Sequence, residues 1–264
     1  MTDRIRAPRG TYDVLPDDAL ARERLEATAR DILERAGYAR VETPIFEATE
    51  LFARGVGEST DVVQKEMYTF PEDGLTLRPE GTAPVCRAYL EHGMHKLPQP
   101  VKLWYLGAYF RRERPQQGRF RQFWQIGAEA IGSDDPAVDA ESILLLSEIL
   151  EAIAARGLRL RISSLGAPET RAEYRHDLQA YLRAHAHQLS SEVRERIDLN
   201  PLRAFDADHP GTREVMQGAP RLLDRLTPDD REHFETVTGL LETTGLAYEV
   251  DPTLVRGLDY YTRT

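Results

Sequence analysis

Five arginines lie within the eleven residues from Arg111 to Arg121 of this 264-residue chain. With one glutamate among them the segment carries +4, whereas the whole chain carries −10 and the other 253 residues therefore −14. Guanidinium groups bind phosphate oxygens through paired hydrogen bonds, so the segment suits a polyphosphate or a nucleic-acid backbone. A hairpin whose arginines stay in water is the alternative, and the acidic remainder of the chain favours the functional interpretation. The net charge itself excludes only a binder whose whole surface is basic.

Two polar residues in the strand pattern that follows suit a small ligand. With period-two alternation, Gln125 and Glu129 share one face with Arg121, and the other face carries Trp124, Ile126, Ala128 and Ala130. Burial of a carboxylate is costly unless it meets a cation or hydrogen-bond donors. One interpretation is therefore a pocket for a polar ligand with an ammonium group or N–H donors. The other is that both side chains face outwards.

Two further segments combine residues that are typical of binding sites. Arg78-Pro79-Glu80-Gly81-Thr82 lies between a hairpin pattern and a helix pattern, where Glu80 and Thr82 also suit plain helix capping. Near the C-terminus, Arg256-Gly257-Leu258-Asp259-Tyr260-Tyr261 joins an arginine, a glycine and two tyrosines in a strand-like run. A glycine there permits close approach of a ligand or of another backbone.

Several common reaction schemes are absent from the sequence. It contains no Walker A sequence, no Gly-x-Gly-x-x-Gly and no His-Glu-x-x-His, and we expect no metal ligands in the chain. The single cysteine, Cys86, excludes an internal disulfide and predicts a reducing, cytoplasmic compartment. No apolar run is long enough to span a membrane and no signal peptide is visible, so we expect no membrane partner.

Helix and strand patterns must position these residues. They predict helices at 18–36, 84–91 and 136–155, a hairpin at 67–78, and strands at 39–43, 101–111, 119–131 and 158–163. Short polar helices follow between 166 and 245, and a strand pattern returns after 245. Hairpins mixed with helices predict an α+β fold with a mainly antiparallel sheet flanked by helices, not a doubly wound fold.

Together these segments resemble the histidyl-tRNA synthetase family of class II aminoacyl-tRNA synthetases. Arg9-Gly10-Thr11-Tyr12-Asp13 is similar to the family's opening, and the helix ending at Gly37 with Glu42-Thr43-Pro44 resembles motif 1. Residues 110–129 resemble motif 2, and the run from Arg256 to Tyr261 is similar to the histidine-specific signature. The resemblance covers essentially the whole chain and includes Asn200-Pro201-Leu202-Arg203 in the polar helical stretch.

The resemblance implies a domain organisation. Residues 1–165 would form the class II catalytic core with motifs 1 and 2. Residues 166–245 would form a small helical insertion domain that contacts the tRNA acceptor arm, and residues 246–264 would return to the core. A homodimer through motif 1 is also expected.

The resemblance further implies roles for individual residues in activating histidine with ATP and transferring it to tRNA(His). Arg111 and Arg256 would be catalytic, because fixed cations stabilise the charge that grows as the histidine carboxylate attacks the α-phosphate. ATP, accompanied by Mg²⁺, would be bound by Arg111, Glu113 and Arg256. Histidine would be bound by Glu80, Thr82 and Gln125 at its ammonium group, and by Glu129, Tyr260 and Tyr261 around its imidazole. The tRNA acceptor end would meet Arg114, Gln116, Arg119 and Arg121.

The sequence departs from the family pattern at its end. It stops at Thr264, without the Gly-rich second half of the histidine signature, motif 3 or the anticodon-binding domain. We therefore expect an N-terminal catalytic fragment with impaired or no activity. The alternative is the regulatory paralogue that partners a short ATP phosphoribosyltransferase in histidine biosynthesis. The full motif 2 loop and the run from Arg256 to Tyr261 favour the synthetase.

Overall fold

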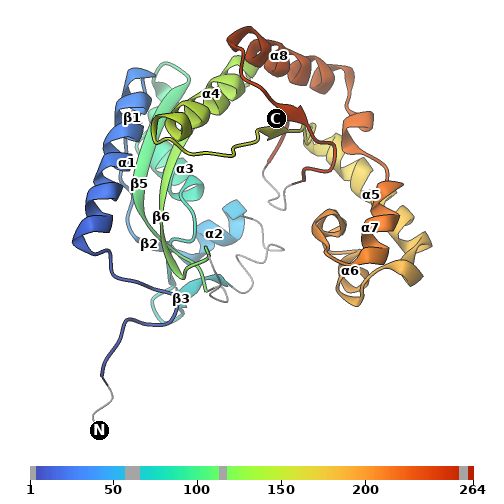
Figure 1. The fold of residues 1–264 in the computed structure, drawn as a ribbon, viewed down its shortest axis with the longest axis horizontal. Coiled ribbons are helices and arrows are strands. Elements are labelled where there is room, and N and C mark those ends of the chain that lie inside the picture. The colour runs from blue at the N-terminus through green and yellow to red at the C-terminus, as the bar shows by residue number, and fades with distance from the viewer. Residues whose placement is uncertain (1–3, 57–65, 113–117, 256–260) are drawn as a thin grey trace. The chain divides into compact units, whose positions relative to one another are not determined.

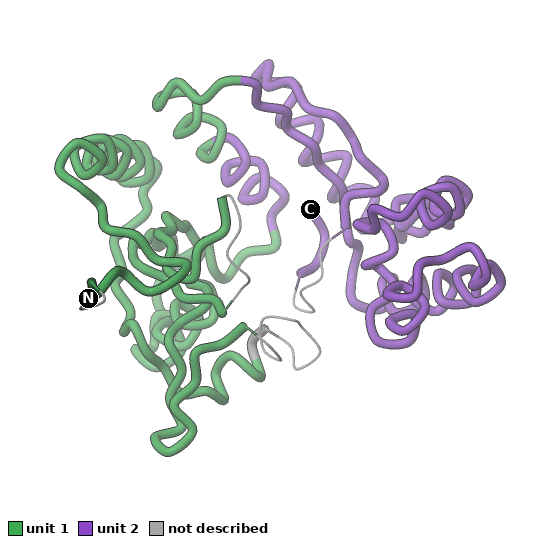
Figure 2. Tube along the Cα trace, turned by 60° about the horizontal axis from the view of Figure 1, so that its bottom comes forward, with its two compact units in different colours: residues 1–134, 145–156 green, residues 135–144, 157–264 purple. Residues whose placement is uncertain are grey.

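The computed structural model describes residues 4–56, 66–112, 118–255 and 261–264. The chain forms two compact units, shown in different colours in Figure 2. Unit 1 comprises residues 1–134 and 145–156, and unit 2 comprises residues 135–144 and 157–264. The helical insertion expected at 166–245 lies within unit 2, and its boundaries stay a prediction.

Unit 1 is built around a long antiparallel hairpin (Figure 1). Its strands β5 (Val101–Phe110) and β6 (Gln122–Ile131) pair from Val101↔Ile131 to Phe110↔Gln122. On its other side β5 pairs in parallel with the short strand β1 (Ala39–Arg40). A second sheet, also antiparallel, has the order β2 (Phe46–Ala48), β4 (Leu75–Leu77), β3 (Tyr68–Phe70). The helices of this part are α1 (Pro16–Arg35), α2 (Thr49–Val56), α3 (Thr82–Glu91), the 3-10 helix η2 (Met94–Lys96) and the second half of α4 (Pro136–Ala152).

The two faces of the β5–β6 hairpin pack against different helices. On one face, Trp104 lies in a buried cluster with Leu33 of α1 and Leu145 of α4. On the other face, Tyr109 packs with Val85 of α3. The alternation predicted for β6 is therefore confirmed, because its apolar residues Ile126 and Ala130 pack with the α1 cluster while Gln125 and Glu129 face α3.

Helix α1 shows how local sequence fixes an element. It begins at Pro16, where the missing N–H of proline costs nothing, and Asp17 and Asp18 suit the positive end of the helix dipole. It ends just before Gly37, whose φ of +85° is a conformation that favours glycine. The predicted helix at 18–36 is confirmed within two residues at its start.

A buried arginine organises the chain around the second sheet. Arg78, only 4% exposed, donates from Nη1 to Thr43 O at 2.7 Å and from Nε to Ala108 O at 3.0 Å. Its backbone N–H also donates to Ile45 O at 2.9 Å. The strand predicted at 39–43 is limited to Ala39–Arg40, and the carbonyl of Thr43 beyond it accepts from the Arg78 guanidinium.

Unit 2 is mainly helical. Its core includes Tyr174, Leu178 and Leu182 of α5, packed with Val193 of α6 and Val215 of α7. None of the helices in the described part of the chain is both long and apolar enough to cross a bilayer. Beside the first part of α4, its elements are β7 (Arg161–Ile162), α5 (Pro168–Ala184), η3 (Ala186–Gln188), α6 (Ser191–Arg196), η4 (Pro201–Asp206), α7 (Pro210–Gln217), η5 (Leu222–Arg225), α8 (Pro228–Thr244) and β8 (Glu249–Val250).

A buried aspartate joins the starts of two helices in unit 2. Asp230, in the first turn of α8, is 1% exposed and accepts hydrogen bonds from Ala167 N at 3.0 Å and Thr170 Oγ1 at 3.1 Å, at the start of α5. Nε of Arg263 lies 3.6 Å from its other oxygen. Burial alone would raise the pKa of Asp230, but these hydrogen bonds and the arginine hold it below its usual value.

Asp230→Ala should lower the free energy of unfolding by about 2–4 kcal/mol at neutral pH, because it leaves the buried Thr170 hydroxyl and the partly buried Ala167 N–H without their acceptor. Since the folded pKa is depressed, the carboxylate stabilises the fold above its unfolded pKa, and this contribution is lost as the pH falls below about 4. Urea unfolding at several pH values measures both effects. The neighbouring exposed Asp229→Ala is the control, with an expected change below about 1 kcal/mol. Equal losses in the two variants would remove Asp230 from this role.

Candidate functional site

Polar side chains converge where the α3 side of the β5–β6 hairpin meets the start of α3. The register pairs Leu103 with Glu129 and Gly107 with Gln125, which leaves Tyr105 opposite Gly127 between them. Glu129, Gln125 and Tyr105 therefore share one face of the hairpin, as residues two apart on paired strands do. Glu80 and Thr82 approach this face from α3 and the turn before it.

The Glu129 carboxylate is held from two sides. Thr82 Oγ1 donates to Glu129 Oε1 at 2.8 Å, and Tyr105 OH donates to the same oxygen at 3.1 Å. Gln125 Nε2 in turn donates to Tyr105 OH at 3.3 Å. Within the described residues, the second carboxylate oxygen of Glu129 accepts no hydrogen bond and no cation forms an ion pair with it. This oxygen is therefore an acceptor available to a ligand.

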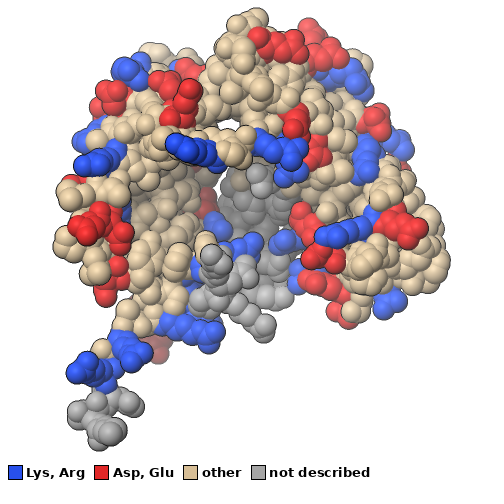
Figure 3. Space-filling model, viewed as in Figure 1, with Lys and Arg blue, Asp and Glu red and all other residues tan. Residues whose placement is uncertain are grey.

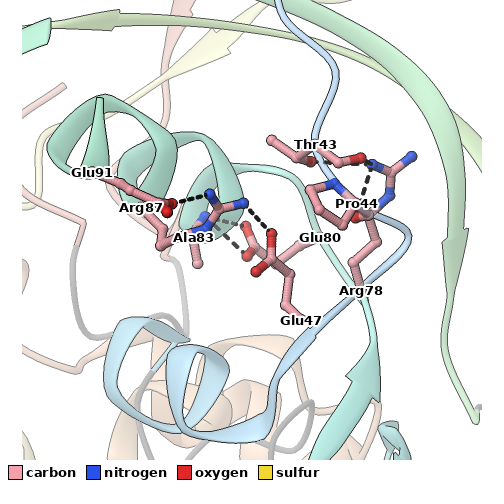
Figure 4. Close-up of polar contacts among 8 residues, drawn as sticks. All are labelled: Thr43, Pro44, Glu47, Arg78, Glu80, Ala83, Arg87 and Glu91. Carbon is pink, nitrogen blue, oxygen red and sulfur yellow. Dashed lines mark hydrogen bonds and ion pairs between the residues drawn. The ribbon is translucent and has the colours of Figure 1, made fainter. Parts of the chain in front are cut away.

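Glu80 lies at the start of α3 (Figure 4). It is 8% exposed and accepts from Thr82 N at 2.7 Å and Ala83 N at 3.0 Å, so it caps the helix. Capping of α3 by Glu80, one of the two sequence interpretations, is therefore confirmed. The same figure shows Arg78 against Thr43 and Pro44, in the structural position described above.

Burial raises the pKa values of both carboxyl groups above their usual range. For Glu80, burial outweighs the hydrogen bonds from the α3 backbone and the nearby charge of Arg111. For Glu129, burial outweighs the donors Thr82 and Tyr105, and the charge of Glu80 raises the pKa further. A site with two such carboxylates favours a positively charged or N–H-bearing ligand, which would relieve their desolvation.

Tyr105 is a site residue that the sequence interpretation missed. Burial and the charge of Glu129 raise the pKa of its hydroxyl group, so it stays protonated and can donate. A Cβ atom on Gly81 would lie 2.4 Å from its ring, and one on Gly127 would lie 2.2 Å from it. Because two glycines make room for the ring, its position is fixed. The available signal was period-two alternation, which places Tyr105 with Leu103 and Gly107 on one face of their strand.

Arg111, the first arginine of the motif 2 segment, lies close to this cluster. Arg111 Nε donates to Pro79 O at 2.9 Å, and its guanidinium lies 5.2 Å from the centroid of the Phe123 ring. These contacts hold the guanidinium beside Glu80. The positive charge of Arg111 there opposes part of the rise that burial causes in the pKa of Glu80. Arg121 N donates to Gly10 O at 2.7 Å, and Arg119 is exposed.

Several predicted site residues cannot be placed in this cluster. Tyr261 is exposed, belongs to unit 2 and accepts a hydrogen bond from Arg171 through its carbonyl. Among the described residues, no group of three or more His, Cys, Asp or Glu side chains could hold a metal ion. Five predicted residues lie outside the described part of the chain: Glu113, Arg114, Gln116, Arg256 and Tyr260.

Comparisons with known proteins agree with this fold. The family model for histidyl-tRNA synthetase matches residues 10–264. A curated histidine–tRNA ligase from Thermosynechococcus vestitus is 51% identical over 263 residues, which cover 98% of this chain and 61% of that protein. The crystal structure of apo S. aureus histidyl-tRNA synthetase matches with a TM-score of 0.76 and 38% identity, over 98% of this chain and 60% of that chain.

A more distant structure shares the fold alone. It is described as an ATP phosphoribosyltransferase regulatory subunit/histidyl-tRNA synthetase from Bacillus halodurans, and it matches with a TM-score of 0.69 at 22% identity. The match covers 97% of this chain and 70% of that one.

The fold is that of the class II aminoacyl-tRNA synthetases. Within that class, the chain belongs to the histidyl-tRNA synthetase family. It spans 61% of the length of the Thermosynechococcus relative.

Glu129→Gln should raise the free energy of unfolding of the ligand-free chain at neutral pH by about 1–3 kcal/mol, because it removes a half-buried charge and keeps an acceptor for Thr82 and Tyr105. The folded pKa of Glu129 is raised, so the folded state takes up a proton as the pH falls and the unsubstituted chain gains stability. The difference between the two proteins should therefore shrink as the pH falls through that raised pKa.

Urea unfolding of both proteins between mildly acidic and neutral pH measures this difference. Glu23→Gln on the exposed side of α1 is the matched control, with an expected change below about 0.5 kcal/mol. A Glu129→Gln variant that is less stable than the unsubstituted chain at neutral pH would show that the charge is compensated in the fold.

Proposed function

We propose that this chain carries the histidine and ATP sites of a histidine–tRNA ligase, which activates histidine as histidyl-adenylate and transfers it to the acceptor end of tRNA(His). The observation that carries the proposal is the half-satisfied Glu129 carboxylate, held by Thr82 and Tyr105 next to Glu80. The α-ammonium group and the imidazole N–H of histidine both need a hydrogen-bond acceptor of this kind.

Histidine would be oriented by its two nitrogen-bearing ends. Glu80, Thr82 and Gln125 would meet the α-ammonium group, since the carboxylate of Glu80 is buried at the start of α3 and offers a negative charge there. Glu129, together with Tyr261 and Tyr260, would read the ring nitrogens. Polar recognition of this kind is selective, because an analogue without the N–H leaves buried groups unpaired.

The reaction would proceed by attack of a histidine carboxylate oxygen on the α-phosphorus of ATP, with release of pyrophosphate. Arg111 and Arg256 would hold the α-phosphate and stabilise the growing charge, and Glu113 would contribute to ATP binding. Arg111 fits this role because Pro79 O and the Phe123 ring hold its guanidinium in one orientation. Mg²⁺ bound with ATP would neutralise part of the phosphate charge.

Transfer requires the acceptor end of tRNA(His) next to the adenylate. Arg114, Gln116, Arg119 and Arg121 would contact that end, as the basic character of their segment favours. A homodimer formed through motif 1 and a cytoplasmic location complete the proposal.

The regulatory paralogue of ATP phosphoribosyltransferase remains the second candidate, since a structure described in those terms shares the fold. Two measurements separate the candidates. Binding of tRNA(His) with histidine-dependent exchange of pyrophosphate into ATP supports the ligase. Histidine binding without tRNA binding, together with a complex with the short transferase, supports the paralogue.

Glu129→Gln should weaken the binding of L-histidine to this chain at least tenfold, because the neutral amide offers less attraction and presents an N–H towards an N–H. Isothermal titration calorimetry gives both dissociation constants. Imidazolepropionate, which lacks the ammonium group, should bind weakly to the unsubstituted chain. In a Glu80→Gln variant, the affinity for imidazolepropionate should fall by a smaller factor than the affinity for histidine.

Glu23→Gln again supplies the control, and its histidine affinity should equal that of the unsubstituted chain. Tyr105→Phe should weaken histidine binding by a smaller factor, since Thr82 still donates to Glu129. Unchanged histidine affinity in Glu129→Gln would place the amino-acid site elsewhere.

A further inference from the structure

The N-terminal segment, residues 4–12, is tied to the start of strand β6. It turns at Gly10, whose φ is +88°, and Thr11 N donates to Pro8 O at 3.0 Å across the turn. Beyond the turn, Arg121 N donates to Gly10 O at 2.7 Å, and Arg121 Nη1 donates to Arg9 O at 3.3 Å. We call residues 4–12 the N-terminal arm.

Arg121 also connects the arm to the proposed ATP site. Its carbonyl accepts from Arg111 N at 2.9 Å, while its own N–H donates to Gly10 O. The backbone at Arg121 therefore lies between the backbones at Gly10 and Arg111 and is hydrogen-bonded to both.

The arm is a strip of positive charge. Arg4, Arg6 and Arg9 are exposed, and within the described residues their guanidinium groups form no hydrogen bond or ion pair. Asp13 is the first acidic residue that follows them. Figure 3 shows Lys and Arg side chains along this extended part of the chain. Three exposed cations on an extended backbone suit the regular spacing of phosphates better than a single compact anion.

An exposed aromatic pair lies at the end of the arm. The rings of Tyr12 and Phe120 are 4.7 Å apart between centroids, and the two residues are 52% and 40% exposed. Arg119 and Arg121 flank Phe120 in the sequence. Aromatic rings next to arginines stack unpaired bases without regard to sequence, and such bases occur in single-stranded RNA.

We infer that the N-terminal arm and residues 119–121 form one RNA-binding surface, in which Arg4, Arg6 and Arg9 contact phosphates and the Tyr12–Phe120 pair stacks an unpaired base. The inference rests on the proposed function and extends the RNA contact beyond the motif 2 loop. The favoured ligand is RNA that passes from a duplex into a single-stranded 3′ end, because phosphate contacts and base stacking lie on neighbouring parts of the surface.

The test compares two triple variants with the same net charge. The first carries Arg4→Gln, Arg6→Gln and Arg9→Gln, which leave the carbonyl of Arg9 in place as the acceptor for Arg121. The control carries Arg24→Gln, Arg30→Gln and Arg156→Gln, three exposed arginines of unit 1 outside the arm. The probe is a fluorescent RNA hairpin with a 5′-phosphate and a single-stranded 3′ end, titrated at several salt concentrations.

The arm variant should reduce the magnitude of the slope of log K against log salt by about 2–3, since each of the three lost phosphate contacts removes about 0.7–0.9 from it. The control variant should keep the slope of the unsubstituted chain. Tyr12→Ala should weaken binding of this hairpin about tenfold and leave the affinity for a blunt-ended hairpin unchanged.

Equal slopes for the arm variant and the control would overturn the inference. If the unsubstituted chain binds the hairpin and only Arg119→Gln with Arg121→Gln weakens it, the arm has no role and the proposed function stands. If the unsubstituted chain binds no RNA at all, the proposed tRNA site and the arm surface both fail. A DNA hairpin bound as tightly as the RNA would also contradict the choice of ligand.

Discussion

A half-buried carboxylate with no ion-pair partner among the described residues is the constraint on which the centre of unit 1 depends. Glu129 comes from β6, and its two donors come from β5 and from the first turn of α3. These donors offset only part of the cost of removing a carboxylate from water. The remaining oxygen can therefore contribute binding energy. A ligand N–H that reaches it supplies a missing hydrogen bond and does not have to displace an existing donor.

The rest of unit 1 keeps those three elements at the required distance. Arg78 joins the chain before the second sheet to the end of β5 through Thr43 O and Ala108 O. Glu80 closes the start of α3 and so fixes Thr82. The Tyr105 ring fills the space that Gly81 and Gly127 leave open, which sets the separation between α3 and the hairpin. Each contact is structural, yet each determines where a functional atom lies.

Much of this arrangement could be predicted from sequence patterns. Alternation in β6 put Gln125 and Glu129 on one face, and Pro and Gly signals marked α1 and the hairpin of β3 and β4. Long-range contacts could not be predicted in this way. Nothing local in Tyr105 shows that two distant glycines surround it, and nothing in Asp230 distinguishes it from Asp229 until α5 is packed against α8. Likewise, nothing local in Thr43 shows that its carbonyl accepts from the side chain of Arg78, 35 residues away.

The long reach of the site contacts has a consequence for how the protein folds. The Thr82–Glu129 hydrogen bond joins residues 47 apart, and Tyr105 reaches Glu129 across 24 residues. Closing such loops has an entropic cost that local helices do not have. We therefore expect α1 and the β3–β4 hairpin to form before these contacts do. The hydrogen-bonded cluster around Glu129 is then among the last parts of unit 1 to assemble. A partly folded chain would therefore expose α1 and its charged side chains before Glu129 gains the two donors that hold it.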